Sequence, residues 1–296
     1  MKIVITGSLG NISKPLAQNL AATNNEVTVV TRSQDKVGAI EALGAKAAVG
    51  DASDVNFLVE TFTGADVIYL MIPPSYQSEN MVQYIADAGK IYADATRESG
   101  VKRVVALSGM GAHLPAGNGP LSGLAVAENH YRQLADVAFT FLRPGGFYVN
   151  YLPQIGLIKN LGIAGDNTPP SSRMLITHPL DIADVAADAI LNPDPTKSER
   201  FIISDELTNA EITALLGQAI GKPDLQWVKF DDEQYRDGLL QNGFSQSTAQ
   251  AFIEMGNAFS EGRAFEIVDK SPEKVVKGTR SFARFATDVF APAFNQ

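Results

Sequence analysis

The stretch that decides the fold is the N-terminal run Met1-Lys2-Ile3-Val4-Ile5-Thr6-Gly7-Ser8-Leu9-Gly10-Asn11-Ile12-Ser13-Lys14-Pro15. Its apolar first part predicts a buried β-strand, and a helical pattern begins after Ser13. Two glycines between a first strand and a first helix are typical of a loop that holds the pyrophosphate of a dinucleotide. Gly7 would permit the tight turn, Gly10 would let backbone N–H groups approach the anion, and the helix N-terminus would face it. The predicted cradle consists of Gly7, Ser8, Leu9, Gly10, Asn11 and Ile12, and an ordinary strand–helix turn is the alternative.

Short apolar runs alternate with longer helical patterns through the first 150 residues. The runs lack the polar–apolar alternation of a half-exposed sheet, as expected for strands that are covered on both faces. The expected strands are Lys2–Thr6, Glu26–Thr31, Ala45–Val49, Val67–Met71, Arg103–Leu107 and Phe139–Leu142. The expected helices are Lys14–Thr23, Asp35–Leu43, Asp54–Phe62, Ser78–Ser99 and Ala125–Ala135. This order predicts an α/β fold with a doubly wound parallel Rossmann sheet, whose carboxyl edge binds ligands.

The regular alternation of apolar runs and helical patterns ends after Arg143-Pro144-Gly145-Gly146. Residues 150–175 are rich in glycine and proline, and glycine breaks separate the helical patterns that follow. We therefore divide the chain into an NAD(P)-binding Rossmann domain, residues 1–150, and a smaller, mostly helical C-terminal lobe, residues 151–296. Part of the second segment is expected to return to the Rossmann sheet. The lobe itself would contact a substrate or a partner.

Composition excludes several classes of protein. The 296 residues include no cysteine, so disulfides and cysteine-ligated metal centres are ruled out, and only three histidines are present. A formal net charge of −9 argues against nucleic-acid binding. The apolar N-terminal run is too short for a signal peptide, and no run approaches about 18 apolar residues. We expect a cytoplasmic protein with a small-molecule substrate, no metal, no nucleic-acid or membrane partner, and a monomeric or homodimeric state.

The ends of the second and third expected strands indicate which dinucleotide binds. Arg32 stands where an NAD site usually has an acidic residue, and with Ser33 and Lys36 it suits the 2′-phosphate of NADP(H). The alternative is a solvent-facing basic turn. Asp51, followed by Ala52, is placed to accept a hydrogen bond from the adenine amine or to cap the next helix. We expect NADP(H) to be preferred over NAD(H).

The remaining cofactor contacts are expected where the later strands end. Residues after the fourth strand would line the nicotinamide ribose, and those after the fifth and sixth strands would let the backbone approach the nicotinamide. The residues expected there are Met71, Ile72, Pro73, Ser108, Pro144 and Gly145.

Several of these elements, taken in order, resemble the NmrA-like branch of the atypical short-chain dehydrogenases/reductases. The resemblance rests on Thr6-Gly7-x-x-Gly10, the Gly50-Asp51 step, Val104–Ser108, the run Phe139–Gly145 and the segment His178-Pro179-Leu180-Asp181-Ile182-Ala183, and it covers essentially the whole chain. It implies a Rossmann domain that binds NADP(H) and a C-terminal lobe that completes the substrate cleft. Some members of this branch reduce quinones, azo dyes or triphenylmethane dyes. Others bind the dinucleotide without turnover and act as redox sensors or regulators.

This sequence departs from the wider superfamily in one respect. Standard members have a Tyr-x-x-x-Lys pair, in which tyrosine transfers a proton and lysine lowers the tyrosine pKa. None of the eight tyrosines has a lysine four residues later, and no lysine occurs between Lys102 and Lys159. Tyr131 lies in the expected helix region, but position 135 is alanine. Dehydrogenation of a simple alcohol is therefore not expected. Hydride transfer to a sufficiently electrophilic acceptor needs no protein acid or base.

Three residues are candidate catalytic groups, and each has a plainer alternative. Ser108 would donate to a substrate carbonyl or only cap the strand–loop junction. His113, in the following loop, would donate a proton or be simply solvated. Tyr131 would face the cofactor or belong to an ordinary helix surface. Substrate contacts are expected from Met110, Phe147 and Tyr148, whose two aromatic rings would form a wall for a flat substrate or a staple between the lobes.

Two functions remain open from the sequence. The first is an NADPH-dependent oxidoreductase that transfers hydride to a quinone-like or other conjugated acceptor. The second is a non-catalytic NADP(H)-binding redox sensor or regulator that acts through a protein partner. Oxidation of NADPH by a quinone would favour the first, and tight binding without turnover would favour the second.

Overall fold

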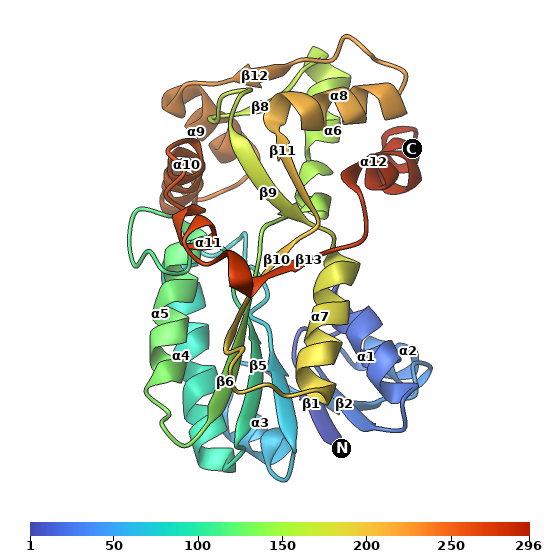
Figure 1. The fold of residues 1–296 in the computed structure, drawn as a ribbon, viewed down its shortest axis with the longest axis vertical. Coiled ribbons are helices and arrows are strands. Elements are labelled where there is room, and N and C mark those ends of the chain that lie inside the picture. The colour runs from blue at the N-terminus through green and yellow to red at the C-terminus, as the bar shows by residue number, and fades with distance from the viewer.

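A parallel sheet of eight strands forms the centre of the structure, a computed structural model that describes all 296 residues (Figure 1). The strands lie in the order β13-β10-β6-β5-β4-β1-β2-β3, and every neighbouring pair is parallel. Their bounds are β1 Lys2–Ile5, β2 Glu26–Thr31, β3 Lys46–Val49, β4 Val67–Leu70, β5 Arg103–Leu107, β6 Ala138–Pro144, β10 Glu199–Ile203 and β13 Val275–Lys277. The strand order reverses between β1 and β4. Ligands of such sheets bind at the carboxyl edge of this crevice.

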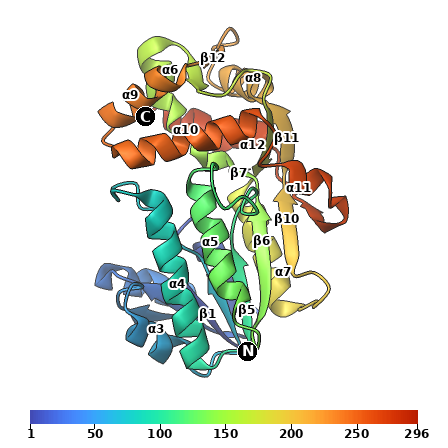
Figure 2. The same ribbon diagram turned by 90° about the vertical axis from the view of Figure 1, so that its left-hand side faces the viewer.

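Helices cover both faces of the sheet (Figures 1 and 2). One face carries α3 (Val55–Phe62), α4 (Met81–Ser99) and α5 (Pro120–Arg132), and the other carries α1 (Ser13–Ala21) and α7 (Pro179–Leu191). The turn η1 (Gln34–Lys36) and α2 (Val37–Glu41) connect β2 to β3. An apolar core fills each interface between sheet and helices. The predicted doubly wound parallel Rossmann sheet is confirmed. None of the helices is both long and apolar enough to cross a membrane.

A smaller lobe stands at the carboxyl edge of the sheet (Figure 1). It contains two small sheets, of order β11-β9-β7 and β12-β8. Their strands are β7 Gly146–Phe147, β8 Ala164–Asp166, β9 Arg173–Thr177, β11 Asp205–Thr208 and β12 Trp227–Lys229. The helices and turns are η2 Tyr148–Tyr151, α6 Gln154–Leu161, α8 Asn209–Ala219, α9 Asp232–Gln241, α10 Gln246–Ser260, α11 Glu266–Asp269, η3 Pro272–Lys274, α12 Phe282–Phe285, η4 Ala286–Phe290 and α13 Ala291–Phe294. The expected helical character is confirmed, with two sheets that the sequence did not predict.

Several elements from beyond residue 150 belong to the sheet layer and not to the lobe. α7 packs on α1, β10 pairs with β6, and β13 pairs with β10 at the edge. The chain therefore crosses repeatedly between the sheet and the lobe. These crossings hold the lobe over the edge where ligands are expected.

The largest boundary difference from the sequence prediction lies in α5. This helix begins at Pro120, not Ala125, and it ends at Arg132. Gly119 precedes it with φ of +54°, and proline at the first helical position loses no hydrogen bond. The shift matters for function because it moves Tyr131 from the middle of the helix to its last turn.

Candidate functional site

The loop between β1 and α1 needs glycine at its first position. Gly7 has φ of +92°, and a Cβ on it would lie 2.4 Å from Met71 Cε and 2.6 Å from Ser13 Oγ. The Ser13 hydroxyl donates to the Thr6 carbonyl at 2.9 Å. Ser13 therefore permits close packing of α1 on β1, and its hydroxyl is directed at the strand.

Backbone N–H groups of this loop are free to bind an anion. Those of Ser8, Leu9, Asn11 and Ile12 make no hydrogen bond within the chain. α1 has no capping side chain and no acidic residue in its first turn, whereas Asp54 caps α3 through two backbone N–H groups. Unsatisfied N–H groups at a helix N-terminus favour a phosphate or pyrophosphate. The residues present therefore fit the pyrophosphate of a dinucleotide.

Two threonines, for which the sequence predicted no individual role, hold this loop in place. Thr6 Oγ1 accepts from the N–H of Met71 at 2.7 Å and donates to the Met71 carbonyl at 3.0 Å, which joins the ends of β1 and β4. Thr31 Oγ1 accepts from Ser8 Oγ at 3.0 Å and from the N–H of Ser33 at 3.3 Å. Their signal in the sequence is a threonine at the carboxyl end of each of two neighbouring parallel strands. Together they fix the cradle relative to β2 and β4.

Exposed basic side chains surround the end of β2. Arg32 and Lys36 are both exposed, and neither takes part in an ion pair. Ser33 is half-buried between them. This charge has no partner in the chain, so it is available to a phosphate. Contact with a 2′-phosphate stays a prediction.

Asp51 lies close to this basic group, at the end of β3. Hydrogen bonds from Ser53 and the nearby charge of Arg32 hold the pKa of the Asp51 carboxyl below its usual value. Asp51 Oδ1 accepts from the N–H of Ser53 at 2.9 Å, whereas Asp54 caps α3. The capping alternative therefore belongs to Asp54. Ala52 is half-buried in this turn, and the adenine contact of Asp51 stays a prediction.

The residues that follow β4 and β6 differ in their access to a ligand. Met71, Ile72 and Pro73 are half-buried beside the cradle. Pro144 and Gly145 are buried, and a Cβ on Gly145 would lie 2.2 Å from the carbonyl oxygen of Leu175 in β9. The close approach of β9 accounts for the glycine at this position, and the approach of a cofactor to this backbone stays a prediction.

Ser108 lies at the carboxyl end of β5, but its hydroxyl is already bonded. The residue is 7% exposed, and its Oγ donates to Glu128 Oε1 at 2.6 Å. Glu128, on α5, is held by Arg143 of β6 through hydrogen bonds of 2.9 and 2.5 Å. A carboxylate only accepts hydrogen bonds, so it draws the serine proton away from any substrate. In this structure Ser108 therefore donates to Glu128, and its expected role as a donor to a substrate carbonyl stays a prediction.

Tyr131 is a core residue, which corrects its expected catalytic role. It lies in the last turn of α5, and α5 runs antiparallel to the strands, so Tyr131 is near the amino edge of the sheet. Its ring stacks on that of Phe139 with 5.3 Å between centroids. Burial raises the pKa of its hydroxyl well above the usual value.

Two of the three expected substrate contacts are also core residues. Met110 packs in an apolar cluster with Phe201 and Phe265. Tyr148 is fully buried in the lobe, and its hydroxyl donates to Asp205 Oδ2 at 2.7 Å. Met110 and Tyr148 are therefore packed in apolar clusters, Tyr148 within the lobe, and their contact with a substrate stays a prediction.

Phe147 and His113 occupy more open positions. Phe147 is half-buried and packs against the same apolar core as Leu9 and Met71, so it stays a candidate contact beside the cradle. His113 is not simply solvated, because both ring nitrogens are buried without a hydrogen-bond partner. It lines a cavity beside α5 and not the crevice between β1 and β4.

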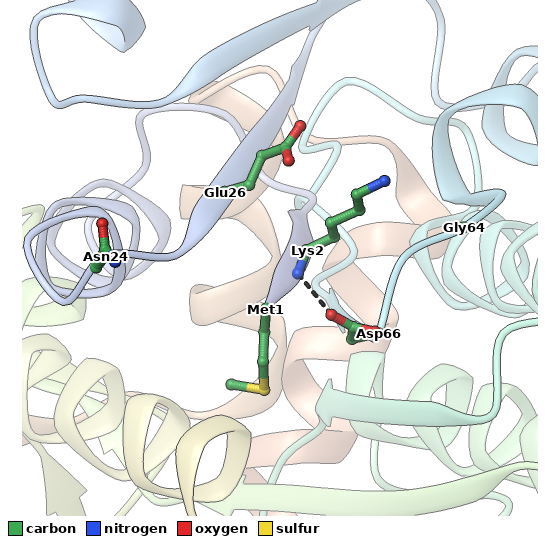
Figure 3. Close-up of a pocket in the computed structure, with 6 residues that line it drawn as sticks. All are labelled: Met1, Lys2, Asn24, Glu26, Gly64 and Asp66. Atoms are coloured by element: carbon green, nitrogen blue, oxygen red, sulfur yellow. Dashed lines mark hydrogen bonds between the residues drawn. The ribbon is translucent and has the colours of Figure 1, made fainter.

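One hollow in the surface lies at the edge of the sheet opposite to the cradle. A depression of about 430 Å³ is lined by Met1, Lys2, Asn24, Glu26, Gly64 and Asp66, as Figure 3 shows. These residues stand at the amino ends of β1 and β2 and before β4. Ligands of doubly wound sheets bind at the carboxyl edge, so we assign no activity to this hollow. No group of three or more His, Asp or Glu side chains lies close enough to hold a metal ion.

Comparison with known proteins gives a family and several relatives. A family model described as NAD(P)H-binding matches residues 7–193. The chain is 25% identical to an NAD(P)H azoreductase of Xenophilus azovorans, over 96% of each chain. Among solved structures, the NADPH-dependent quinone oxidoreductase of Escherichia coli, complexed with NADPH, has a TM-score of 0.78 at 20% identity, covering 97% of this chain and 99% of that one. The negative transcriptional regulator NmrA, in complex with NADP, has a TM-score of 0.74 at 15% identity, covering 99% and 96%.

Proposed function

The chain belongs to the NAD(P)H-binding family, and we propose that within it the protein is an NADPH-dependent reductase of quinone-like or other conjugated acceptors. The observation that carries this proposal is the cradle between β1 and α1, with four unbonded N–H groups beside the exposed Arg32. The azoreductase relative supports a reductase role. The resemblance to NmrA-like reductases, first suggested by the sequence, is confirmed at the level of family and fold.

The chain's own residues would bind and orient the dinucleotide. The N–H groups of residues 8–12 would hold the pyrophosphate, and Arg32 would pair with a 2′-phosphate. Met71 and Phe147 belong to the apolar surface beside the cradle, where the nicotinamide ring would lie. When bound, the dinucleotide supplies a hydride, and one proton from solvent completes the two-electron reduction of a quinone to a hydroquinone.

The choice of acceptor follows from the side chains that are not available. The Ser108 hydroxyl donates a hydrogen bond to Glu128, and Tyr131 is buried in the core. No lysine stands four residues after any tyrosine. The chain therefore offers no hydroxyl–lysine pair to protonate a simple ketone, which needs that assistance. A conjugated acceptor stabilises the added charge itself, and azo compounds and quinones share this property.

A non-catalytic sensor is the second candidate, because the same bonded Ser108 and buried Tyr131 are compatible with binding without turnover. The structural likeness to NmrA, a regulator, concerns the fold and is compatible with both functions. In the sensor, the bound dinucleotide would alter a surface that a protein partner contacts. The two candidates differ in whether the bound cofactor is consumed.

The experiment that separates them is a fluorescence titration with NADPH and NADH, followed by addition of menadione, an azo dye or cyclohexanone. We expect tighter binding of NADPH, and its oxidation by menadione and the dye but not by the ketone. The Gly10→Val variant is the control for oxidation at another site. Tight binding without oxidation by any conjugated acceptor would replace the reductase by the sensor. Rapid reduction of cyclohexanone would contradict our account of the missing proton donor.

A further inference from the structure

A cavity of about 180 Å³ lies on the flank of the sheet, between α5, the carboxyl end of β6 and the loop after β5. We call it the Arg143 cavity. Four of its lining residues lie on one face of α5, at the helical spacing of 125, 128, 129 and 132, and they are joined by His113 and Arg143. Two strands, β5 and β4, separate β6 from β1. The cavity is therefore distinct from the dinucleotide cradle.

Nitrogen atoms of two residues lining this cavity lack hydrogen-bond partners. Arg143 is buried, with 4% of its side chain exposed, and its Nη1 makes no hydrogen bond; the nearest carboxylate oxygen, Glu199 Oε1, is 3.5 Å away. Both ring nitrogens of His113 are also buried and unbonded. The backbone carbonyl of Arg263 lies near the ring, but no hydrogen bond of normal geometry forms. Leaving such donors unbonded is costly, so the cavity is chemically suited to an acceptor.

The charges around the cavity do not cancel. Arg143, Arg132 and Lys274 contribute three positive charges, while Glu128 and Glu199 contribute two negative charges. One positive charge is left over in this network, in which Arg143 and Glu128 are buried while the side chains of Arg132 and Lys274 are 45% and 40% exposed. Arg132 also lines the cavity. The volume exceeds the roughly 30 Å³ that one water occupies in the liquid, and a small polyatomic ion fits.

We propose that the Arg143 cavity is a binding site for a small oxyanion, a carboxylate or a phosphate, held by Arg143, Arg132 and His113. Arginine guanidinium groups bind both ions in the same forked geometry. The imidazole adds a directed N–H at the inner wall. The proposal stands apart from the proposed reductase function, because it rests on the flank of β6 and not on the crevice between β1 and β4.

Nuclear magnetic resonance of the histidine side chains tests it directly, because the chain has only His113, His130 and His178. We would titrate the protein with sodium acetate and, separately, with sodium phosphate, keeping ionic strength constant with sodium chloride. We expect a saturable shift confined to His113 and a rise in its pKa, because an anion stabilises the imidazolium. The acetate and phosphate arms show which oxyanion is preferred. Phosphate that occupied only the dinucleotide cradle would leave His113 unmoved.

Matched variants complete the test. Arg132→Gln should weaken the oxyanion affinity by about tenfold or more, since it removes a charge-assisted hydrogen bond. Arg97→Gln removes an exposed arginine of α4 from its pair with Asp94 and should leave the affinity unchanged. The proposal would be overturned by shifts of equal size at all three histidines, by shifts that do not saturate, or by equal oxyanion affinities in both variants. The cavity would then be interpreted as holding only water. Unchanged His130 and His178 resonances would confirm that the variants are folded.

Discussion

Replacing Glu128 with glutamine should destabilise the protein far more than the loss of an ordinary surface carboxylate. Glu128 is 3% exposed at its side chain, and it bonds Arg143 twice, at 2.9 and 2.5 Å, while accepting the Ser108 hydroxyl at 2.6 Å. The variant keeps the shape but removes the charge that compensates a buried guanidinium. Breaking a buried ion pair from one side costs about 3–5 kcal/mol of unfolding free energy. Because the Glu199 carboxylate lies 3.5 Å from Arg143 Nη1 and partly compensates its charge, we expect a loss of unfolding free energy of about 3 kcal/mol.

Urea unfolding followed by circular dichroism measures this loss. With a denaturant slope of about 3 kcal/mol per molar, a loss of about 3 kcal/mol lowers the unfolding midpoint by about 1 M. The matched control is Glu206→Gln, since Glu206 pairs with Arg173 at 2.7 Å but the two side chains are 50% and 41% exposed. Exposed pairs contribute less than about 1 kcal/mol. The control midpoint should therefore move little.

A double variant separates the charge effect from loss of packing. Glu128→Leu together with Arg143→Met removes both buried charges, and it should recover most of the stability lost in Glu128→Gln, because buried pairs replaced by apolar residues are often neutral. Equal midpoints for Glu128→Gln and Glu206→Gln would refute the view that this ion pair holds α5 to β6. A double variant with a lower unfolding midpoint than Glu128→Gln would show that the apolar side chains do not fill the space left by the ion pair.

Four further predictions address the site and the lobe. Arg32→Asp should weaken NADPH binding by about a hundredfold or more and leave NADH binding nearly unchanged in fluorescence titrations; equal losses would remove Arg32 from 2′-phosphate recognition. Gly10→Val should abolish dinucleotide binding and leave the circular dichroism spectrum unchanged, because even a Cβ at this position would lie 3.2 Å from the Gly7 carbonyl oxygen. Retained binding would place the cofactor elsewhere. Tyr131→Phe should leave turnover and its pH profile unchanged, because the ring is stacked in the core; loss of turnover in a folded variant would restore a catalytic role. Burial raises the pKa of Asp166 to about 6, above its ordinary value, so the Asp166 carboxyl stabilises the fold in acid and this stabilisation is lost as pH rises from about 4 through about 6. Asp166→Asn should remove this pH-dependent loss of unfolding free energy, worth up to about 3 kcal/mol. Identical curves of stability against pH for the variant and the parent protein would contradict it.

The parts of this protein that follow from local pattern were predictable from the chain. The cradle was predictable because a strand, two glycines and a helix lie within fifteen consecutive residues, and each residue's role depends on its near neighbours. The parallel sheet was predictable because apolar runs alternate with helical patterns, and right-handed connections leave few arrangements for them. The absence of a Tyr-x-x-x-Lys pair is likewise a property of spacing alone. Arg32 was predicted to contact a 2′-phosphate from its place at the end of β2; the residue is exposed there, and the contact stays a prediction.

The roles of the remaining candidate residues depended on partners distant in the sequence. The Ser108 hydroxyl donates a hydrogen bond to Glu128, 20 residues away, and Gly145 is glycine because β9 packs against it. Tyr148 bonds Asp205, 57 residues later, so a ring that suited a substrate wall became part of the core. Hydrogen bonds and burial of this kind are decided by which surfaces meet when the sheet and lobe close on each other. The sequence alone predicted where a dinucleotide would bind. The tertiary structure decided which side chains are left free to act on it, because a polar group can bind a ligand only when no neighbour in the fold already takes its hydrogen bonds.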